Sequence, residues 1–206
     1  MSEYQDYRWN SGEFTIAHAY FMQPIMKMLP VDGSPILDVG CGNGAFANYL
    51  NSKGYNVYGT DASESGINIA KRINPDRFYL QDLSTDGLPI ELNGIKFKTI
   101  LSTEVVEHLY DPKRYIRFCK SILVNQEGGN LIISTPYHGY LKNLALSVFN
   151  VWDKHFTVLW DGGHIKFWSF KTLSQLLKEN EFKIVAFKGC GRFPFLWKSM
   201  IVNSKI

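Results

Sequence analysis

The chain has 206 residues, of which 45% are hydrophobic and 20% charged. This composition is typical of a single globular domain over residues 1–206 and excludes a disordered chain, a collagen-like repeat or a coiled coil. The net charge of +3 is too small to indicate a nucleic-acid partner. Three cysteines without metal-type spacing and a polar N-terminus without a signal-peptide pattern favour a reducing, cytoplasmic location. No apolar run approaches the roughly 18 residues of a membrane span.

Short apolar runs rich in β-branched and aromatic residues alternate with amphipathic stretches along the chain. We expect the first thirty residues to form a helical cap, in which Pro24 breaks the helix or starts a second one. Ser63 and Asp111 are the expected N-caps of two later helices. The predicted strands span residues 36–39, 56–60, 77–81, 97–102, 130–135, 181–188 and 197–203. The predicted helices span residues 44–53, 63–73, 112–124 and 171–180.

This alternation predicts an α/β fold with a mostly parallel sheet and helices on both faces. The last two strands are separated only by a loop at residues 189–194 that contains glycine and proline. Because a short loop joins antiparallel neighbours, we expect the final strand to run antiparallel to the strand before it.

The strongest motif is ILDVGCGNG at residues 36–44, a buried strand that ends in a glycine-rich turn before a helix. Glycines there allow a tight turn and let a ligand approach the backbone. The helix N-terminus then offers free N–H groups to an anionic group.

Polar residues recur at the ends of the next predicted strands. Asp61, Asp82 and Thr103 follow Gly40 at equal intervals of 21 residues. Ligands of open α/β sheets bind at the carboxyl ends of the strands, so we expect these residues to line one site. Asp61 is placed to accept hydrogen bonds from ribose hydroxyls, and Asp82 to meet a further part of the ligand, such as an adenine amino group.

A dinucleotide site is the main alternative, because Gly40-x-Gly42-x-x-Ala45 followed by Asp61 fits the looser fingerprint. Asp38 argues against it, since a negative charge suits a cationic centre or an amino group better than a pyrophosphate. The chain also leaves little room for a separate catalytic domain.

The glycine motif, the strand end Gly-Thr-Asp61 and the strand end Gln-Asp82-Leu resemble the class I S-adenosylmethionine-dependent methyltransferases. The resemblance covers most of the chain and implies a Rossmann-like sheet of seven strands with the last one antiparallel. It also implies S-adenosyl-L-methionine as cofactor, with its methionine moiety at Asp38, Gly40 and Gly42, its ribose at Asp61, its adenine at Asp82 and Leu83, and its sulfur end near Thr103. Cys41 and Ala62, beside these residues, complete the predicted cofactor contacts.

The segment Glu104-x-x-Glu107-His108 follows the fourth predicted strand and has three interpretations. His108 is a candidate general base for a hydroxyl. Glu104, Glu107 and His108 together would suit a divalent metal that lowers a hydroxyl pKa. Alternatively, Glu104 and His108 fix a loop near the cofactor. We favour the structural interpretation and predict no metal site.

Within the family, the chain is most similar to the ubiquinone-biosynthesis O-methyltransferases. The resemblance rests on Trp9-Asn-Ser-Gly-Glu-Phe14 with His18 and Gln23-Pro24, on the Glu104–His108 segment, which matches a proposed metal triad, and on Thr135-Pro136 followed later by Gly163 and His164. Residues 160–168 depart from that group, as do the residues after Pro24 and the shorter length. The resemblance therefore implies the fold and cofactor of that group for this chain, whereas it does not identify the methyl acceptor.

Aromatic residues and histidines are concentrated at residues 137–170. Leu141, Leu144, Ala145, Val148 and Trp152 follow helical spacing. This face either packs on the sheet edge, forms a lid over an apolar acceptor pocket after the fifth strand, or contacts a membrane. We favour the lid.

These features predict O-methylation of a small molecule by in-line transfer. The candidate catalytic residues are His108, Glu104 and His164, with His155 as a further base candidate. Three alternatives stay open: a sugar or other polar acceptor, an NAD-dependent oxidoreductase, and a non-catalytic cofactor-binding module. The sequence leaves the oligomeric state open.

Overall fold

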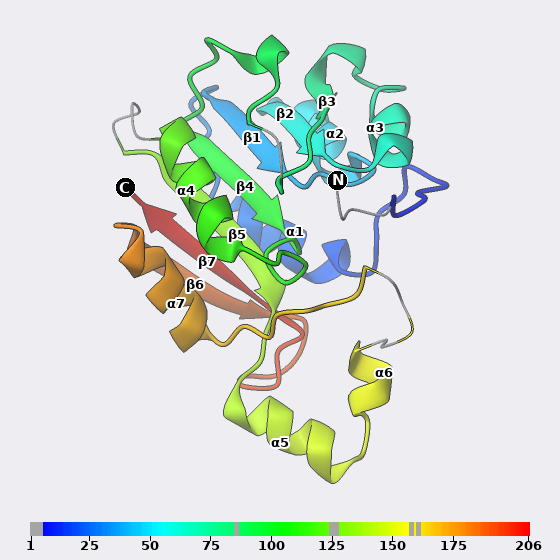
Figure 1. The fold of residues 1–206 in the computed structure, drawn as a ribbon, viewed down its shortest axis with the longest axis vertical. Coiled ribbons are helices and arrows are strands. Elements are labelled where there is room, and N and C mark those ends of the chain that lie inside the picture. Colours follow the sequence, from blue (N-terminus) through cyan, green and yellow to red (C-terminus); the bar gives the residue numbers. More distant parts are fainter. Residues whose placement is uncertain (1–5, 85–86, 124–127, 157–158, 160–161) are drawn as a thin grey trace.

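The computed structural model describes residues 6–206 except 85–86, 124–127, 157–158 and 160–161. Its centre is one seven-stranded sheet in the order β3-β2-β1-β4-β5-β7-β6 (Figure 1). The strands are β1 (Pro35–Val39), β2 (Asn56–Asp61), β3 (Phe78–Leu80), β4 (Thr99–Thr103), β5 (Asn130–Pro136), β6 (Lys183–Cys190) and β7 (Ser199–Lys205).

Strands β1 to β5 are parallel, and β7 runs antiparallel between β5 and β6. The hairpin of β6 and β7 forms because only a short loop joins them. The predicted Rossmann-like sheet with an antiparallel last strand is confirmed. Both hairpin strands begin two residues after their predicted first residues, 181 and 197.

Helices cover both faces of the sheet, as predicted. The described helices are α1 (His18–Met26), α2 (Ala45–Ser52), α3 (Glu64–Ala70), α4 (Pro112–Leu123), α5 (Tyr140–Val148), α6 (Trp152–Phe156) and α7 (Phe170–Glu179), with single 3-10 turns at Pro75–Arg77 and Ile90–Leu92. Ile36 packs with α1, α2 and α3, whereas Leu37 packs with α4 and α7, because successive strand residues point to opposite faces. Residue 124, the predicted end of α4, lies outside the described residues.

The predicted N-caps are confirmed by side-chain hydrogen bonds. The Ser63 hydroxyl accepts a hydrogen bond from the backbone N–H of Gly66 at 3.1 Å. The Asp111 carboxylate accepts one from the N–H of Arg114 at 2.9 Å. Each cap satisfies one of the backbone donors that a helix start leaves unpaired.

The predicted helical cap over the first thirty residues is wrong in extent. Residues 6–17 form no regular element, and the helix runs only over His18–Met26. Pro24 lies inside this helix and does not break it. Phe21 and Ile25, both fully buried in the core, keep the last turn in place although proline supplies no backbone donor there.

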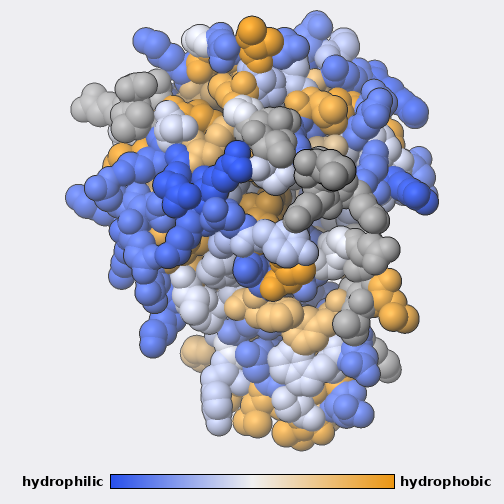
Figure 2. Space-filling view, viewed as in Figure 1, coloured by the Kyte–Doolittle hydropathy of each residue, from blue (hydrophilic) through white to orange (hydrophobic). Residues whose placement is uncertain are grey.

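The segment after β5 does not take one of the three positions considered for it, packing on the sheet edge. Helices α5 and α6 lie beyond the end of the sheet (Figure 1). Leu141, Leu144 and Val148 are 48%, 45% and 70% exposed, so this face does not pack on the sheet edge. Figure 2 shows hydrophobic side chains on the surface at this end of the molecule.

None of the helices in the described part of the chain is long and apolar enough to cross a bilayer. Cys41, Cys119 and Cys190 are buried, free thiols.

Candidate active site

A cavity of about 1890 Å³ lies at the carboxyl ends of the parallel strands. Its size exceeds the roughly 300–1,000 Å³ that a single small ligand uses, so it has room for a cofactor and an acceptor. The equally spaced Gly40, Asp61, Asp82 and Thr103 all line it, as the sequence predicted. Of the other predicted cofactor residues, the cavity wall includes Cys41, Gly42, Ala62 and Leu83.

The glycine turn is closely packed from both sides. Gly40 has φ +78°, and a Cβ atom there would lie 2.3 Å from Val105 Cγ2. Gly42 has φ +56°, and its Cβ would lie 2.8 Å from the Trp9 ring. A larger residue at either position would therefore meet both backbone strain and a clash.

Asp61 joins the first two strand ends. Its Oδ2 accepts a hydrogen bond from the Gly42 N–H at 2.7 Å, and its Oδ1 accepts one from the Ser63 N–H at 2.8 Å. Burial raises the pKa of Asp61 above its ordinary value, while these hydrogen bonds oppose the shift. A carboxylate has about four acceptor positions, so Asp61 retains capacity for a ligand in the cavity.

Asp38 lies in β1, just before the glycine turn, and is only 1% exposed. Its Oδ1 atom has no hydrogen-bond partner within the described ranges. Burial, with a contribution from the charge of Asp61, raises the pKa of Asp38 to about 8. A buried carboxyl of this kind is costly for the protein and suits a cationic partner.

Asp82 shapes the loop after β3. Its Oδ1 accepts hydrogen bonds from the Ser84 N–H at 2.8 Å and from the Ser84 hydroxyl at 2.7 Å. The neighbouring Gln81, which also lines the cavity, donates to the carbonyl of Gly87 at 2.8 Å. This third strand end is therefore held by its own loop.

Glu104 connects three strands and adopts an unusual backbone conformation, with φ +55°. Its Oε1 accepts a hydrogen bond from the Ser134 hydroxyl at 2.8 Å, and its Oε2 accepts one from Ser199 at 3.2 Å. Burial raises the pKa of Glu104 to about 7, although both serines act in the opposite direction. Left-handed backbone at a non-glycine residue is frequent at functional sites.

Glu107 and His108 pack against the segment that carries His164. Glu107 is completely buried, and its Oε2 accepts a hydrogen bond from Thr135 at 2.9 Å. Burial and the neighbouring Glu104 raise the pKa of Glu107 well above its ordinary value. The backbone oxygen of Glu107 accepts hydrogen bonds from the N–H groups of Ile165 and Lys166, which fixes the 163–166 segment over the site.

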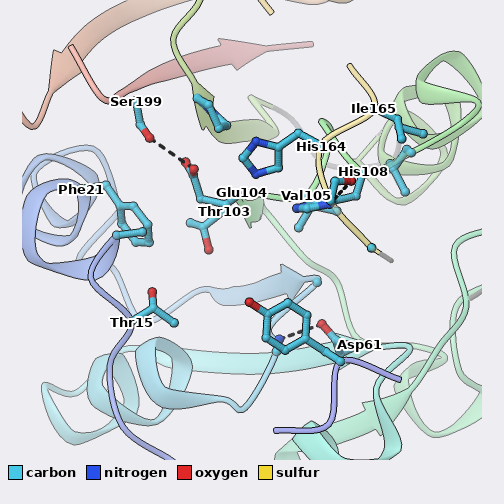
Figure 3. A pocket seen from close by; sticks show the side chains of 18 of the residues that line it. Thr15, Phe21, Asp61, Thr103, Glu104, Val105, His108, His164, Ile165 and Ser199 are labelled. Atoms are coloured by element: carbon cyan, nitrogen blue, oxygen red, sulfur yellow. Dashed lines mark hydrogen bonds between the residues drawn. The ribbon is translucent and has the colours of Figure 1, made fainter. Parts of the chain in front are cut away.

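His108 and His164 meet in this site although 56 positions separate them in the sequence. Their ring centroids are 5.0 Å apart, and Figure 3 shows both rings at the cavity with Glu104 turned toward Ser199. His108 Nδ1 lies 3.2 Å from the carbonyl oxygen of Gly163. Because a carbonyl only accepts, this contact is a hydrogen bond in the tautomer that has its proton on Nδ1 and its lone pair on Nε2. The Nε2 atom lies 4.0 Å from Glu107 Oε1.

The donor atoms of Glu107, His108 and His164 lie within 4.8 Å of one another, a spacing compatible with a metal ion. This set differs from the triad considered in the sequence. Glu104 is outside it because Ser134 and Ser199 hold its carboxylate.

An N-terminal strap, defined here as residues 6–13, crosses the glycine turn and was missed by the sequence analysis. Asp6 accepts hydrogen bonds from the hydroxyls of Ser63 and Ser65, both at 2.6 Å. The Trp9 N–H donates to Ser65 at 2.9 Å, and the Trp9 ring stacks on Tyr7 with centroids 4.6 Å apart. In the sequence, Trp9–Phe14 contributes only to the family resemblance and is predicted to be helical, whereas residues 6–13 form no regular element.

Comparisons with known proteins identify the family of the chain. A family described as methyltransferase domain matches residues 15–186, and the chain belongs to this family. A ubiquinone biosynthesis O-methyltransferase of Cereibacter sphaeroides is 32% identical over 131 residues, which are 63% of this chain and 52% of that protein. One of Ruegeria is 30% identical over 176 residues, covering 82% and 68%.

The chain spans about half the length of the first curated relatives it matches. Among solved structures, magnesium protoporphyrin IX methyltransferase of Synechocystis with bound S-adenosylhomocysteine has a TM-score of 0.64 at 20% identity, covering 89% of this chain and 79% of that one. A methyltransferase of Mesorhizobium loti has a TM-score of 0.65 at 21% identity, covering 89% and 96%. These likenesses show the fold.

The prediction that the chain belongs to a methyltransferase family is thereby confirmed. The residues present fit the predicted cofactor, S-adenosylmethionine: Gly40, Gly42 and Asp61 line the cavity, and Asp38 is a buried carboxyl with an unpartnered oxygen. The family match favours this cofactor over the dinucleotide alternative.

Proposed function

We propose that this chain transfers a methyl group to an oxygen of a small-molecule acceptor. The observation that carries the proposal is the convergence of four strand ends and His108 on one cavity large enough for two ligands. The curated relatives named as O-methyltransferases support oxygen as the acceptor atom.

The cofactor would be held by the residues carried over from the family resemblance. Asp38, Gly40 and Gly42 would receive the methionine moiety, and Asp61 the ribose. Asp82 and Leu83 would border the adenine, with Cys41, Ala62 and Thr103 completing the contacts. When bound, S-adenosylmethionine supplies an already activated methyl group.

The protein's part in the reaction is to orient the acceptor and to remove its proton. His108 is the proposed general base because Nε2 holds the lone pair while Nδ1 is engaged with Gly163. Burial lowers the pKa of His108 below its ordinary value, so the ring is neutral and able to accept a proton at pH 7. His164, whose ring centroid lies 5.0 Å from that of His108, would position this base, and Glu104, which lines the cavity, would position the acceptor.

Residues 137–170 would act as the lid over the acceptor. Within this segment, Leu146, Phe156, His164 and Phe167 line the cavity. Exclusion of water by such a lid strengthens electrostatic interactions at the reacting atoms.

The test is methyl transfer from isotope-labelled S-adenosylmethionine to a panel of catechols, monophenols, sugars and primary amines. We expect transfer to hydroxyl-bearing acceptors and its loss in His108→Gln, with Lys183→Met, an exposed β6 substitution, as the matched control. Transfer to amines alone, or full turnover in His108→Gln, would contradict the proposal.

A further inference from the structure

Helix α5 buries its lysine and exposes two of its three leucines. Lys142 is 5% exposed and Leu146, one turn later, is 8% exposed, whereas Leu144 is 45% exposed. A helix placed for stability alone would have the opposite orientation, because burying an ammonium group costs more than exposing a leucine. Lys142 and Leu146 share one helix face and both line the cavity. The orientation of α5 therefore indicates a function for the Lys142 amine inside the cavity.

The Lys142 ammonium receives little compensation from the described protein groups. Nζ donates a hydrogen bond to the backbone oxygen of Lys198 at 3.3 Å, and none of the ion pairs between described residues includes Lys142. The acid whose charge acts on Lys142, Glu104, is held by two serines. Burial lowers the pKa of Lys142 to about 8, which leaves the amine mostly protonated at pH 7. A buried cation of this kind is stabilised by an anion from outside the protein.

Arg192, an exposed residue, adds a second positive charge to the cavity wall. It lies in the loop between β6 and β7, lines the cavity, and its charge acts on both Lys142 and His155. His155 also lines the cavity, and its buried Nε2 has no hydrogen-bond partner in the described part of the chain. Burial, with the charges of Lys142 and Arg192, lowers the pKa of His155 to about 4, so the positive charge at pH 7 comes from the lysine and the arginine.

Apolar side chains on the same helices and segment also line the cavity, among them Leu146, Val151, Phe156 and Phe167. We infer that Lys142 and Arg192 form a subsite for an anionic group, a carboxylate or a phosphate, carried by an otherwise apolar methyl acceptor. A guanidinium and an ammonium together match the several acceptor oxygens of such a group. The inference rests on the proposed function for identifying the ligand as the acceptor, whereas the anion subsite follows from the side chains themselves.

The test uses two dyes with the same apolar body. 8-Anilinonaphthalene-1-sulfonate carries one sulfonate, and N-phenyl-1-naphthylamine carries none. Fluorescence titration at pH 7 gives the dissociation constant of each dye for the wild type, Lys142→Met, Lys142→Arg, Arg192→Gln and the control Lys183→Met. We expect Lys142→Met to weaken binding of the sulfonate about ten-fold, roughly 1.4 kcal/mol, and to change binding of the neutral dye less than two-fold. Lys142→Arg should restore most of the affinity, and Arg192→Gln should weaken only the sulfonate.

The ratio of the two affinities separates the subsite from general apolar binding, including binding to the exposed face of α5. An unchanged ratio in Lys142→Met, or an equal loss for both dyes, would overturn the inference. Calorimetric titration with S-adenosylhomocysteine on the same variants is a separate readout. Its failure in every variant would refute the proposed function and leave the dye result standing.

Discussion

The substitution Asp38→Asn should stabilise the ligand-free protein, and the gain should grow with pH. The pKa of Asp38 rises from 3.8 to about 8 because the carboxyl is buried and lies near Asp61. One pKa unit corresponds to about 1.4 kcal/mol, so Asp38 lowers the free energy of unfolding by on the order of 5 kcal/mol once the pH exceeds about 8 and the carboxyl is ionised in both states. The sign follows from the raised pKa. The Asp38 carboxyl does not lower the free energy of unfolding below pH 3.8, and it lowers it progressively as the pH rises to about 8.

Asparagine does not titrate, so the variant lacks this loss. Urea unfolding of both proteins at pH 5 and pH 8 measures it, and we expect the variant's advantage to be larger at pH 8 by about 3 kcal/mol. The other raised carboxyls, Glu104 among them, are common to both proteins and cancel in the difference. An advantage that is equal at both pH values, or larger at pH 5, would mean that Asp38 is ionised in the folded protein. The same variant should bind S-adenosylhomocysteine more weakly, as expected for a destabilising residue retained for a ligand.

Three further predictions concern the base, the strap and a close contact. His108→Gln should lower kcat about 10²–10⁴-fold, while the affinity for S-adenosylhomocysteine measured by calorimetry should stay within about two-fold. A loss of affinity as large as the loss of kcat would assign His108 to cofactor binding. Trp9→Ala should weaken that affinity about ten-fold, roughly 1.4 kcal/mol, because the ring covers Gly42, and unchanged affinity would remove the strap from the site. Gly66→Ala should lower thermal stability by about 1–3 kcal/mol, because its Cβ would lie 2.5 Å from the Gly42 oxygen. The control Asn68→Ala, at an exposed position of the same helix, should not lower it. A stabilised Gly66→Ala variant would refute the contact.

The sheet and the cofactor half of the site were predictable because they depend on local patterns. Each strand is a short apolar run, and parallel strands bring their carboxyl ends to one edge. Gly40, Asp61, Asp82 and Thr103 therefore meet wherever the sheet forms. The antiparallel end followed from the short loop between the last two strands.

The acceptor half depends on contacts that no local pattern encodes. His164 reaches His108 because the backbone of Glu107 holds residues 165 and 166, a pairing visible only in the folded chain. The apolar spacing of α5 suggested a buried leucine face, yet the helix turns Lys142 inward, since the cavity and not the sheet lies beside it. The prediction at Pro24 failed because burial of neighbouring residues outweighed a local preference. Residues 160–161, part of the segment that departs from the relatives, lie outside the described residues.

The central claim is that the strand-end cavity binds S-adenosylmethionine through Asp61 and the glycine turn. Calorimetric titration of S-adenosylhomocysteine into the wild type and Asp61→Ala, with NAD as the comparison ligand, tests it most directly. We predict one molecule bound per chain, at least ten-fold weaker binding in Asp61→Ala, and no heat from NAD. Equal binding by the two proteins, or binding of NAD in place of S-adenosylhomocysteine, would contradict the account.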